Sequence, residues 1–232
     1  MSPIVKWSAF VAMAGFLFGF DTAVISGADK PIQTLWGLSD LQHGLLIMSM
    51  ALWGTVVGAI GGNWPTDRLG RRATLVLIGI LYLSSAVGSA LSTDPYWFSF
   101  FRLIGGIGVG ISSVAAPTYI SEIAPPRHRG FLVAMYQFNI VFGILMAFVS
   151  NYVIGSLMSD DAWRWMLGIE AIPALIYTLM ITRVPRSPRW LILKKNAIEE
   201  AGQVLRQINP DADVDAEINA IRAAETDEAS AK

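Results

Sequence analysis

Apolar residues fill six stretches of this chain, each about as long as a membrane-spanning helix. A helix of this length crosses the roughly 30 Å of a bilayer's hydrocarbon core, and inside lipid only a helix satisfies its own backbone polar groups. We therefore predict an all-α, polytopic membrane protein with the lipid bilayer as its main surrounding. The six predicted spans are residues 7–28, 41–64, 73–92, 96–121, 131–154 and 163–183.

Polar residues dominate after the sixth stretch, so we divide the chain into a six-helix transmembrane bundle at 1–183 and a tail at 184–232. Apolar residues recur at helical spacing within this tail, which predicts a short amphipathic helix that ends at Asn209-Pro210. A weaker repeat after it suggests a second helix. The apolar positions are Ile198, Ala201, Val204, Leu205 and Ile208 in the first, and Val214, Ile218 and Ile221 in the second.

Basic residues indicate the orientation, because loops rich in Lys and Arg stay in the cytosol. The second loop, the fourth loop and the tail carry most of them, whereas the first, third and fifth loops together contain only Lys30. Both termini are therefore expected in the cytosol. The outer loops are short and contain no glycosylation sequon, which fits a location in the cell membrane of a bacterium, that is, its inner membrane.

Composition narrows the function classes. Hydrophobic residues make up 53% of the chain and charged residues 15%, which argues against a soluble bundle. Cysteine is absent from the sequence, so disulfides, thiolate chemistry and cysteine metal sites are excluded. The histidines, His43 and His128, lack a sequence context for catalysis. We expect no enzyme activity, no cofactor, no metal and no nucleic-acid partner.

Two charged residues stand out well inside the apolar stretches, Asp21 in the first and Arg102 in the fourth. Both are expected about 10 Å below the outer surface, at about 1.5 Å of helix per residue. A charge at this depth is costly, so each should face the bundle interior or a water-filled cavity. They could form a fixed structural ion pair, or Asp21 could exchange a proton during a conformational cycle.

Glycines recur at four-residue spacing in three of the stretches, which predicts close helix packing. The run Gly105–Gly110 superficially resembles a dinucleotide-binding loop, but it lies inside a long apolar helix with no strand before it, so a nucleotide role is rejected. The spaced glycines are Gly15 and Gly19, then Gly54, Gly58 and Gly62, then Gly106 and Gly110.

Several motifs in order resemble the signature series of the sugar porter family of the major facilitator superfamily, specifically its amino-terminal half. The matching segments are GFDTAVISG at 19–27, DRLGRR at 67–72, Arg102 with GGIGVG at 105–110, YISEIAP at 119–125 with Arg129-Gly130, YQF at 136–138, WRW at 163–165 and PRSPRWL at 185–191. The resemblance covers nearly the whole chain. Within the family, the chain resembles bacterial proton-coupled sugar symporters.

The resemblance implies roles for individual residues. Asp21 falls where proton-coupled members carry their coupling aspartate, and Arg102 falls at its arginine neighbour. Gln137 matches a glutamine that hydrogen-bonds sugar hydroxyls, and without the family it would equally fit a bond between helices. Phe18 and Gly54 match positions that line the same cavity.

A second set of residues matches the cytosolic charge cluster that holds the inner gate of such transporters shut. Without the family, these residues would be read as loops that follow the positive-inside rule. The set is Asp67, Arg68, Arg71, Arg72, Glu122, Arg129 and Arg189.

The sequence also departs from the family pattern. Ile144 stands where many members have a second sugar-binding glutamine, so the preferred sugar could differ. Arg186 replaces the acidic residue usual between Pro185 and Ser187, which reverses a charge in the gate cluster. Asn63 stands where a glycine often opens the second-loop motif.

The chain has one set of six predicted spans, whereas transporters of this type bind substrate between two six-helix halves. We therefore expect the amino-terminal half of a transporter that moves a monosaccharide by proton symport and needs a carboxyl-terminal half, from the same gene or from a partner chain. The alternative is a sugar sensor or a membrane assembly subunit that has the same fold but transports nothing.

Overall fold

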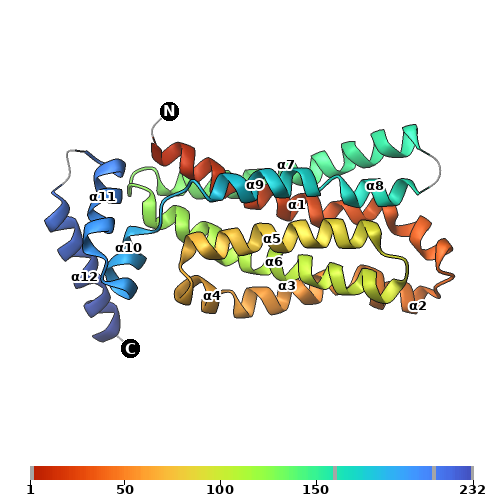
Figure 1. Cartoon of the computed structure of the whole chain (residues 1–232), viewed down its shortest axis with the longest axis horizontal. Coiled ribbons are helices and arrows are strands. Elements are labelled where there is room, and N and C mark those ends of the chain that lie inside the picture. The colour runs from red at the N-terminus through yellow and green to blue at the C-terminus, as the bar shows by residue number, and fades with distance from the viewer. Residues whose placement is uncertain (1–2, 159–160, 211–212, 231–232) are drawn as a thin grey trace.

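The computed structural model describes residues 3–158, 161–210 and 213–230, and every regular element in these ranges is helical. The long helices run side by side, and the last helices lie across one end of the bundle (Figure 1). The helices of the bundle are α1 (Pro3–Leu35), α2 (Asp40–His43), η1 (Gly44–Met48), α3 (Met50–Gly61), α4 (Asn63–Arg68), α5 (Arg71–Leu91), α6 (Pro95–Ile123), α7 (Arg129–Leu157), α8 (Ala162–Gly168) and α9 (Ala171–Ile181).

Six segments are long and apolar enough to cross a membrane, which confirms the predicted number. The first is longer than predicted, because α1 continues past Ala28 and through Pro31 to Leu35. Ile32 on this extension is fully buried, and the ring of Trp36 just beyond it packs against Phe98 at 5.6 Å. Burial of these apolar side chains stabilises the extra turns despite the polar residues before them.

Close backbone contacts join the helices in two pairs, α1 with α7 and α3 with α6. A Cβ atom at Gly19 would lie 1.9 Å from the carbonyl oxygen of Ile140, and one at Gly106 would lie 2.0 Å from that of Ala51. Only glycine permits such an approach, as predicted from the four-residue spacing. α5 packs against α6 on one side and α9 on the other.

Gly54 and Gly61 lie on the same helix and offer a matched test of this packing. A Cβ atom at Gly54 would lie 2.3 Å from the carbonyl oxygen of Leu103, whereas nothing lies within 4 Å at Gly61. We expect Gly54→Ala to lower the free energy of unfolding in detergent by about 1–3 kcal/mol. Gly61→Ala should change it by less than about 0.5 kcal/mol. Equal effects in a denaturant titration would contradict the close packing of α3 on α6.

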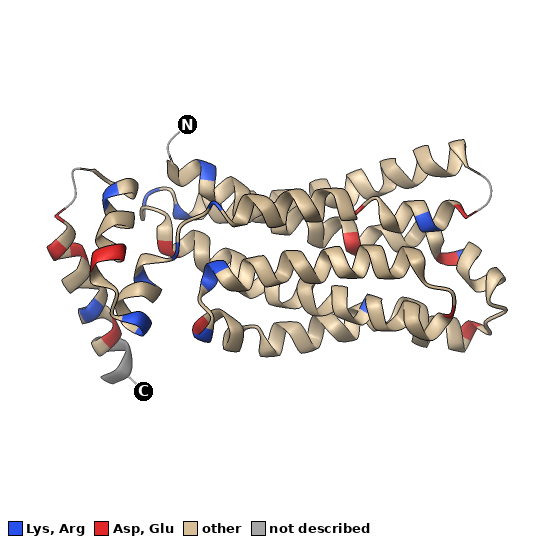
Figure 2. Cartoon of the chain, viewed as in Figure 1, with Lys and Arg blue, Asp and Glu red and all other residues tan. Residues whose placement is uncertain are grey.

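The tail forms a small helical unit at one end of the bundle, where the N-terminal end of α1 also lies (Figure 1). Its helices are α10 (Pro188–Trp190), η2 (Leu191–Lys195), α11 (Ile198–Ile208) and α12 (Val214–Ser230). Trp190 and Leu191 pack with apolar residues of α11 and with Ile218 of α12. Lys and Arg residues gather at this end of the molecule (Figure 2), which we call the tail end.

Candidate functional site: a buried charge cluster

Asp21 and Arg102 form a buried ion pair between α1 and α6, as the sequence suggested. Their exposed fractions are 1% and 3%. Nη1 of Arg102 lies 2.5 Å from Oδ1 of Asp21, and Nη2 donates to the main-chain carbonyl of Asp21 at 3.2 Å. The guanidinium therefore contacts both the side chain and the backbone of α1, which fixes the two helices relative to each other at this depth.

Glu170 is a third member of this charge cluster, and the sequence analysis overlooked it. Its exposed fraction is 1%, and its carboxylate interacts electrostatically with both Asp21 and Arg102. The sequence did contain the signal, a charged residue well inside an apolar stretch. Glu170 is as many residues from the predicted start of its span, at Trp163, as Asp21 is from the predicted end of its span, at Ala28. The buried site is therefore a cluster of two carboxylates and one guanidinium, with helices from the first, fourth and sixth spans.

A break in the sixth span positions Glu170. The span is not one continuous helix, since α8 ends at Gly168 and α9 begins at Ala171. Pro173 has no N–H to donate to the carbonyl of Ile169, and its ring would clash with that carbonyl in a regular helix. The carbonyl of Ile169 accepts instead from the N–H of Ile172 at 3.2 Å. Glu170 lies within this irregular turn.

The hydrogen bonds of the cluster are incomplete. Among the described residues, no partner is found for Nε of Arg102, Oε1 of Glu170 or the hydroxyl of the adjacent Ser85, although all three atoms are buried. A buried polar atom without a partner costs free energy, so the unpaired atoms of this cluster call for an explanation. The cluster also carries one excess negative charge when both carboxylates are ionised, and it becomes neutral when it holds one proton.

A chain of hydroxyl groups lies in the bundle interior. Tyr82 of α5 is fully buried, and its hydroxyl lies 3.4 Å from Oγ of Ser112. Ser112 in turn lies 3.3 Å from the hydroxyl of Tyr136 on α7. The sequence analysis did not single out these three residues, because hydroxyls at unrelated positions give no local pattern.

The residues expected to bind sugar lie outside this cluster. Gln137 is exposed on α7. Phe18 is half-buried on α1, the helix that packs against α7. Gly54 is buried, and it lies directly against the backbone of α6. The structure therefore gives Gly54 a packing role and leaves Gln137 available on the surface of the bundle.

Arg71 is the centre of the charge cluster at the tail end. Its Nε donates to both carboxylate oxygens of Glu122 at 3.0 Å, and its Nη1 lies 3.0 Å from Oδ1 of Asp67. Nη1 also donates to the carbonyl of Thr66 at 3.2 Å. Arg71 thereby joins the start of α5 to the end of α6, through Glu122, and to α4, through Asp67 and Thr66.

The other basic residues expected in this cluster do not share those carboxylates. Arg68 stacks over Trp64 at 5.2 Å, and Arg72 donates to the carbonyl of Thr182. Arg189 lies 3.4 Å from Glu225 of α12. Arg129 is exposed at the start of α7. The sequence grouped these residues together, but only Arg71, Asp67 and Glu122 form one ion-pair network in the part of the chain that the structure describes.

A six-span helical bundle with ionisable side chains buried between its helices defines a multi-pass membrane protein, and the buried side chains form a candidate site in its interior. The chain belongs to the family described as Sugar (and other) transporter, which matches residues 7–232. Members of this family are transporters rather than enzymes. The resemblance noted from the motifs, and the half-transporter fold that it implied, are thereby confirmed.

Individual relatives agree with this family. The "Glucose transport protein" of Synechocystis sp. is 41% identical over 93% of this chain, and the "D-xylose-proton symporter" of Escherichia coli is 37% identical over 89%. The solved structure of the E. coli xylose transporter XylE in a partially occluded inward-open conformation has a TM-score of 0.90 at 34% identity, covering 98% of this chain and 60% of XylE. The chain spans about half the length of the curated relatives, 48% of each of these two.

Proposed function

We propose that this chain is the amino-terminal half of a secondary transporter that moves a monosaccharide by proton symport through alternating access. Sugar transport is supported by the family, and proton coupling is supported by the symporters among the relatives. We place the protein in the cell membrane with both termini in the cytosol, so that the tail end is the cytosolic end. The basic residues gathered there support this orientation (Figure 2).

The buried cluster of Asp21, Arg102 and Glu170 carries this proposal. Its three charged groups leave one negative charge uncompensated, which one proton neutralises. Asp21 is the proposed proton carrier. Arg102 is its electrostatic partner, which forms the ion pair when the Asp21 carboxylate is ionised and loses it when the carboxylate is protonated. A proton that enters or leaves this cluster changes the strength of the contact between α1 and α6, so proton movement can bias the arrangement of the helices.

The Arg71 network is the proposed cytosolic gate. It ties α5 to α6 at the tail end, and its pairs would have to part if that end opened. Arg72, Arg68, Arg129 and Arg189 act in this proposal as further gate residues that engage other groups when the gate changes state. The hydrogen bonds from one guanidinium to both oxygens of Glu122 make this contact directional.

A carboxyl-terminal half completes the proposed binding site. The relatives are about twice as long as the chain, and substrate sites in such transporters lie between two repeats near the bilayer midplane. Gln137 is the proposed sugar ligand, with Phe18 and Gly54 beside the same cavity. The exposed amide on α7 supports this role, because a neutral amide can bind the hydroxyls of an uncharged sugar without a charge cost.

The test of the proposal begins with the reading frame beyond the codon for Lys232, since a complete transporter is needed for flux. The complete protein, in liposomes with an inward proton gradient, should accumulate xylose or glucose above the outside concentration and lose that accumulation when a protonophore is added. Sugar binding without flux would favour the sensor or assembly-subunit alternative. Downhill flux that ignores the proton gradient would remove the symport assignment.

Gln137→Ala in the same complete transporter tests the proposed sugar ligand. We expect sugar affinity to fall about tenfold, the effect of losing one or two hydrogen bonds to a polar ligand, with folding unchanged. Asn139→Ala is the matched control on the same helix, because the side-chain amide of Asn139 already donates a hydrogen bond to the carbonyl of Met135. Equal affinity in the wild type and Gln137→Ala would rule out the ligand role.

A further inference from the structure

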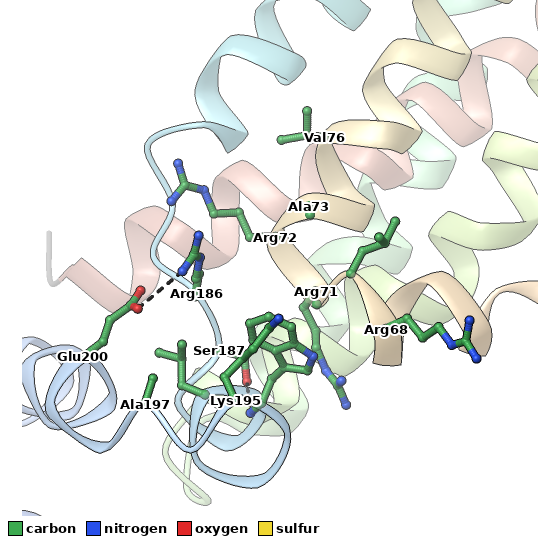
Figure 3. Close-up of a pocket in the computed structure, with 14 residues that line it drawn as sticks. Arg68, Arg71, Arg72, Ala73, Val76, Arg186, Ser187, Lys195, Ala197 and Glu200 are labelled. Atoms are coloured by element: carbon green, nitrogen blue, oxygen red, sulfur yellow. Dashed lines mark hydrogen bonds and ion pairs between the residues drawn. The ribbon is translucent and has the colours of Figure 1, made fainter.

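A cavity of about 800 Å³ lies at the tail end, between the start of α5 and the first part of the tail (Figure 3). Arg68, Arg71 and Arg72 belong both to this cavity and to the gate proposed above, whereas Lys195 belongs to the cavity alone. The lining of the cavity comes from two regions far apart in sequence, residues 68–76, which run from the end of α4 into α5, and residues 186–200. The basic residues in this lining are Arg68, Arg71, Arg72, Arg186 and Lys195, and the acidic residue is Glu200.

The charges of this cavity are poorly balanced. Glu200 pairs with Arg186 at 3.4 Å, and Arg71 is engaged by Glu122 and Asp67 outside the cavity. Arg72 donates to a neutral carbonyl, and Lys195 lies over the ring of Trp190 at 5.5 Å. Neither Arg72 nor Lys195 forms an ion pair within the described ranges. The cavity is therefore lined by cations in excess.

Arg72 and Arg186 are the two guanidinium groups best placed to meet one ligand. In Figure 3 they extend on the same side of the view, one from α5 and the other from the tail, whereas Arg68 points away from them. Guanidinium groups bind phosphate oxygens through paired N–H donors, and Lys195 adds a compact third charge. The Arg186–Glu200 contact, at 3.4 Å and half-exposed, is weak enough for a stronger anion to compete with Glu200.

The start of α5 forms part of the same wall. Gly70, Arg71, Arg72 and Ala73 all line the cavity, and they form the N-cap and first turn of α5. The first amides of a helix have no partner within the helix, and Gly70 has no side chain to cap them. Partial positive charge at a helix start favours an anion, which reinforces the side chains already described.

The walls of the cavity are held in place before any ligand binds. The indole N–H of Trp190 donates to the carbonyl of Asp67 at 2.8 Å, and its backbone N–H donates to Oγ of Ser187 at 3.3 Å. Gly70 has a φ of 88° and lies under the Trp190 ring, where a Cβ atom would come within 2.8 Å. A site with fixed walls binds with less loss of conformational entropy.

We propose that this cavity binds a phosphate-bearing anion, held by Arg72, Arg186 and Lys195. The ligand is either a phosphodiester headgroup of an anionic lipid or a free phosphate compound, because both present the same oxygens. Arg186 gives the chain this property, since an acidic residue at this position would cancel the excess charge. The proposal does not depend on transport, so its test uses binding alone.

The test compares three variants of the purified chain with the wild type. Arg186→Glu reverses the central charge, and Lys195→Gln removes an exposed charge with little risk to folding. Arg206→Glu is the control, because Arg206 is exposed on α11 and does not line the cavity. One arm titrates inorganic pyrophosphate into protein in neutral detergent by calorimetry. The other arm counts retained phosphatidylglycerol and phosphatidylcholine by native mass spectrometry.

We expect the wild type and Arg206→Glu to bind equally and Arg186→Glu to bind about tenfold more weakly, with a smaller loss for Lys195→Gln. A loss in the pyrophosphate arm identifies a free phosphate compound as the ligand class, and a loss of phosphatidylglycerol alone identifies a lipid headgroup. The proposal is overturned if the wild type binds in neither arm, or if Arg186→Glu and Lys195→Gln both bind as tightly as the wild type.

Discussion

Asp21→Asn is expected to abolish uphill sugar accumulation by the complete transporter while it preserves sugar binding and sugar exchange. Asparagine has nearly the shape of aspartate, but its side chain does not ionise at physiological pH. Position 21 can then no longer take up or release the proton. The proposed sugar ligand, Gln137 on α7, is not part of the cluster. The measurement compares accumulation driven by a proton gradient with exchange of labelled sugar at equal concentrations.

The control for this substitution is Asp215→Asn, which makes the same chemical change at an exposed position on α12. It should leave both accumulation and exchange at wild-type levels. Proton-driven accumulation that persists in Asp21→Asn would contradict the assigned role of Asp21. Loss of both accumulation and exchange would indicate that the carboxylate is needed for the structure or for the transport cycle itself, rather than for coupling alone.

Arg102→Met is expected to lower the free energy of unfolding by about 3–5 kcal/mol, a larger loss than that expected for Gly54→Ala. Methionine fills much of the same volume, but its introduction leaves Asp21 and Glu170 buried without a compensating cation. The loss should appear in a denaturant titration of the chain in detergent. Arg206→Met, on the exposed face of α11, should change the same quantity by less than about 0.5 kcal/mol.

A compensating pair of substitutions separates charge from packing in this result. Arg102→Met combined with Asp21→Asn removes one uncompensated carboxylate, so it should recover a large part of the lost stability. The coupling between the two positions is then read from the double-mutant cycle. Purely additive losses would mean that Arg102 stabilises the bundle by packing, and that the ion pair adds little.

The spans and the central ion pair could be predicted because both depend on local properties of the sequence. Apolar length fixed the number of spans, and the cost of burying Asp21 and Arg102 in lipid made their pairing the simplest outcome. The end of α1 was predicted too early, because the polar residues around Lys30 concealed the tertiary burial of Ile32. That burial comes from helices distant in sequence.

Other parts of the site depended on packing that no local pattern records. Glu170 was overlooked although its depth resembled that of Asp21, and its position further depends on the break that Pro173 imposes. The pairing of Arg71 with both Glu122 and Asp67 depends on how the helices assemble, so no local pattern could single it out among the nearby arginines. The sugar-binding role of Gln137 and Phe18 stays a prediction that transport assays have to test.

The depth of Asp21 has an electrical consequence under the proposed orientation. Arg102 lies about 10 Å along α6 from its start at Pro95, and the Asp21 carboxylate is in contact with Arg102. An entering proton would therefore cross about a third of a hydrocarbon core of roughly 30 Å, and about a third of the membrane voltage. At 100 mV this fraction is worth about 0.8 kcal/mol, or about a fourfold change in how often the cluster holds a proton. Proton loading from outside would therefore depend on membrane voltage as well as on pH.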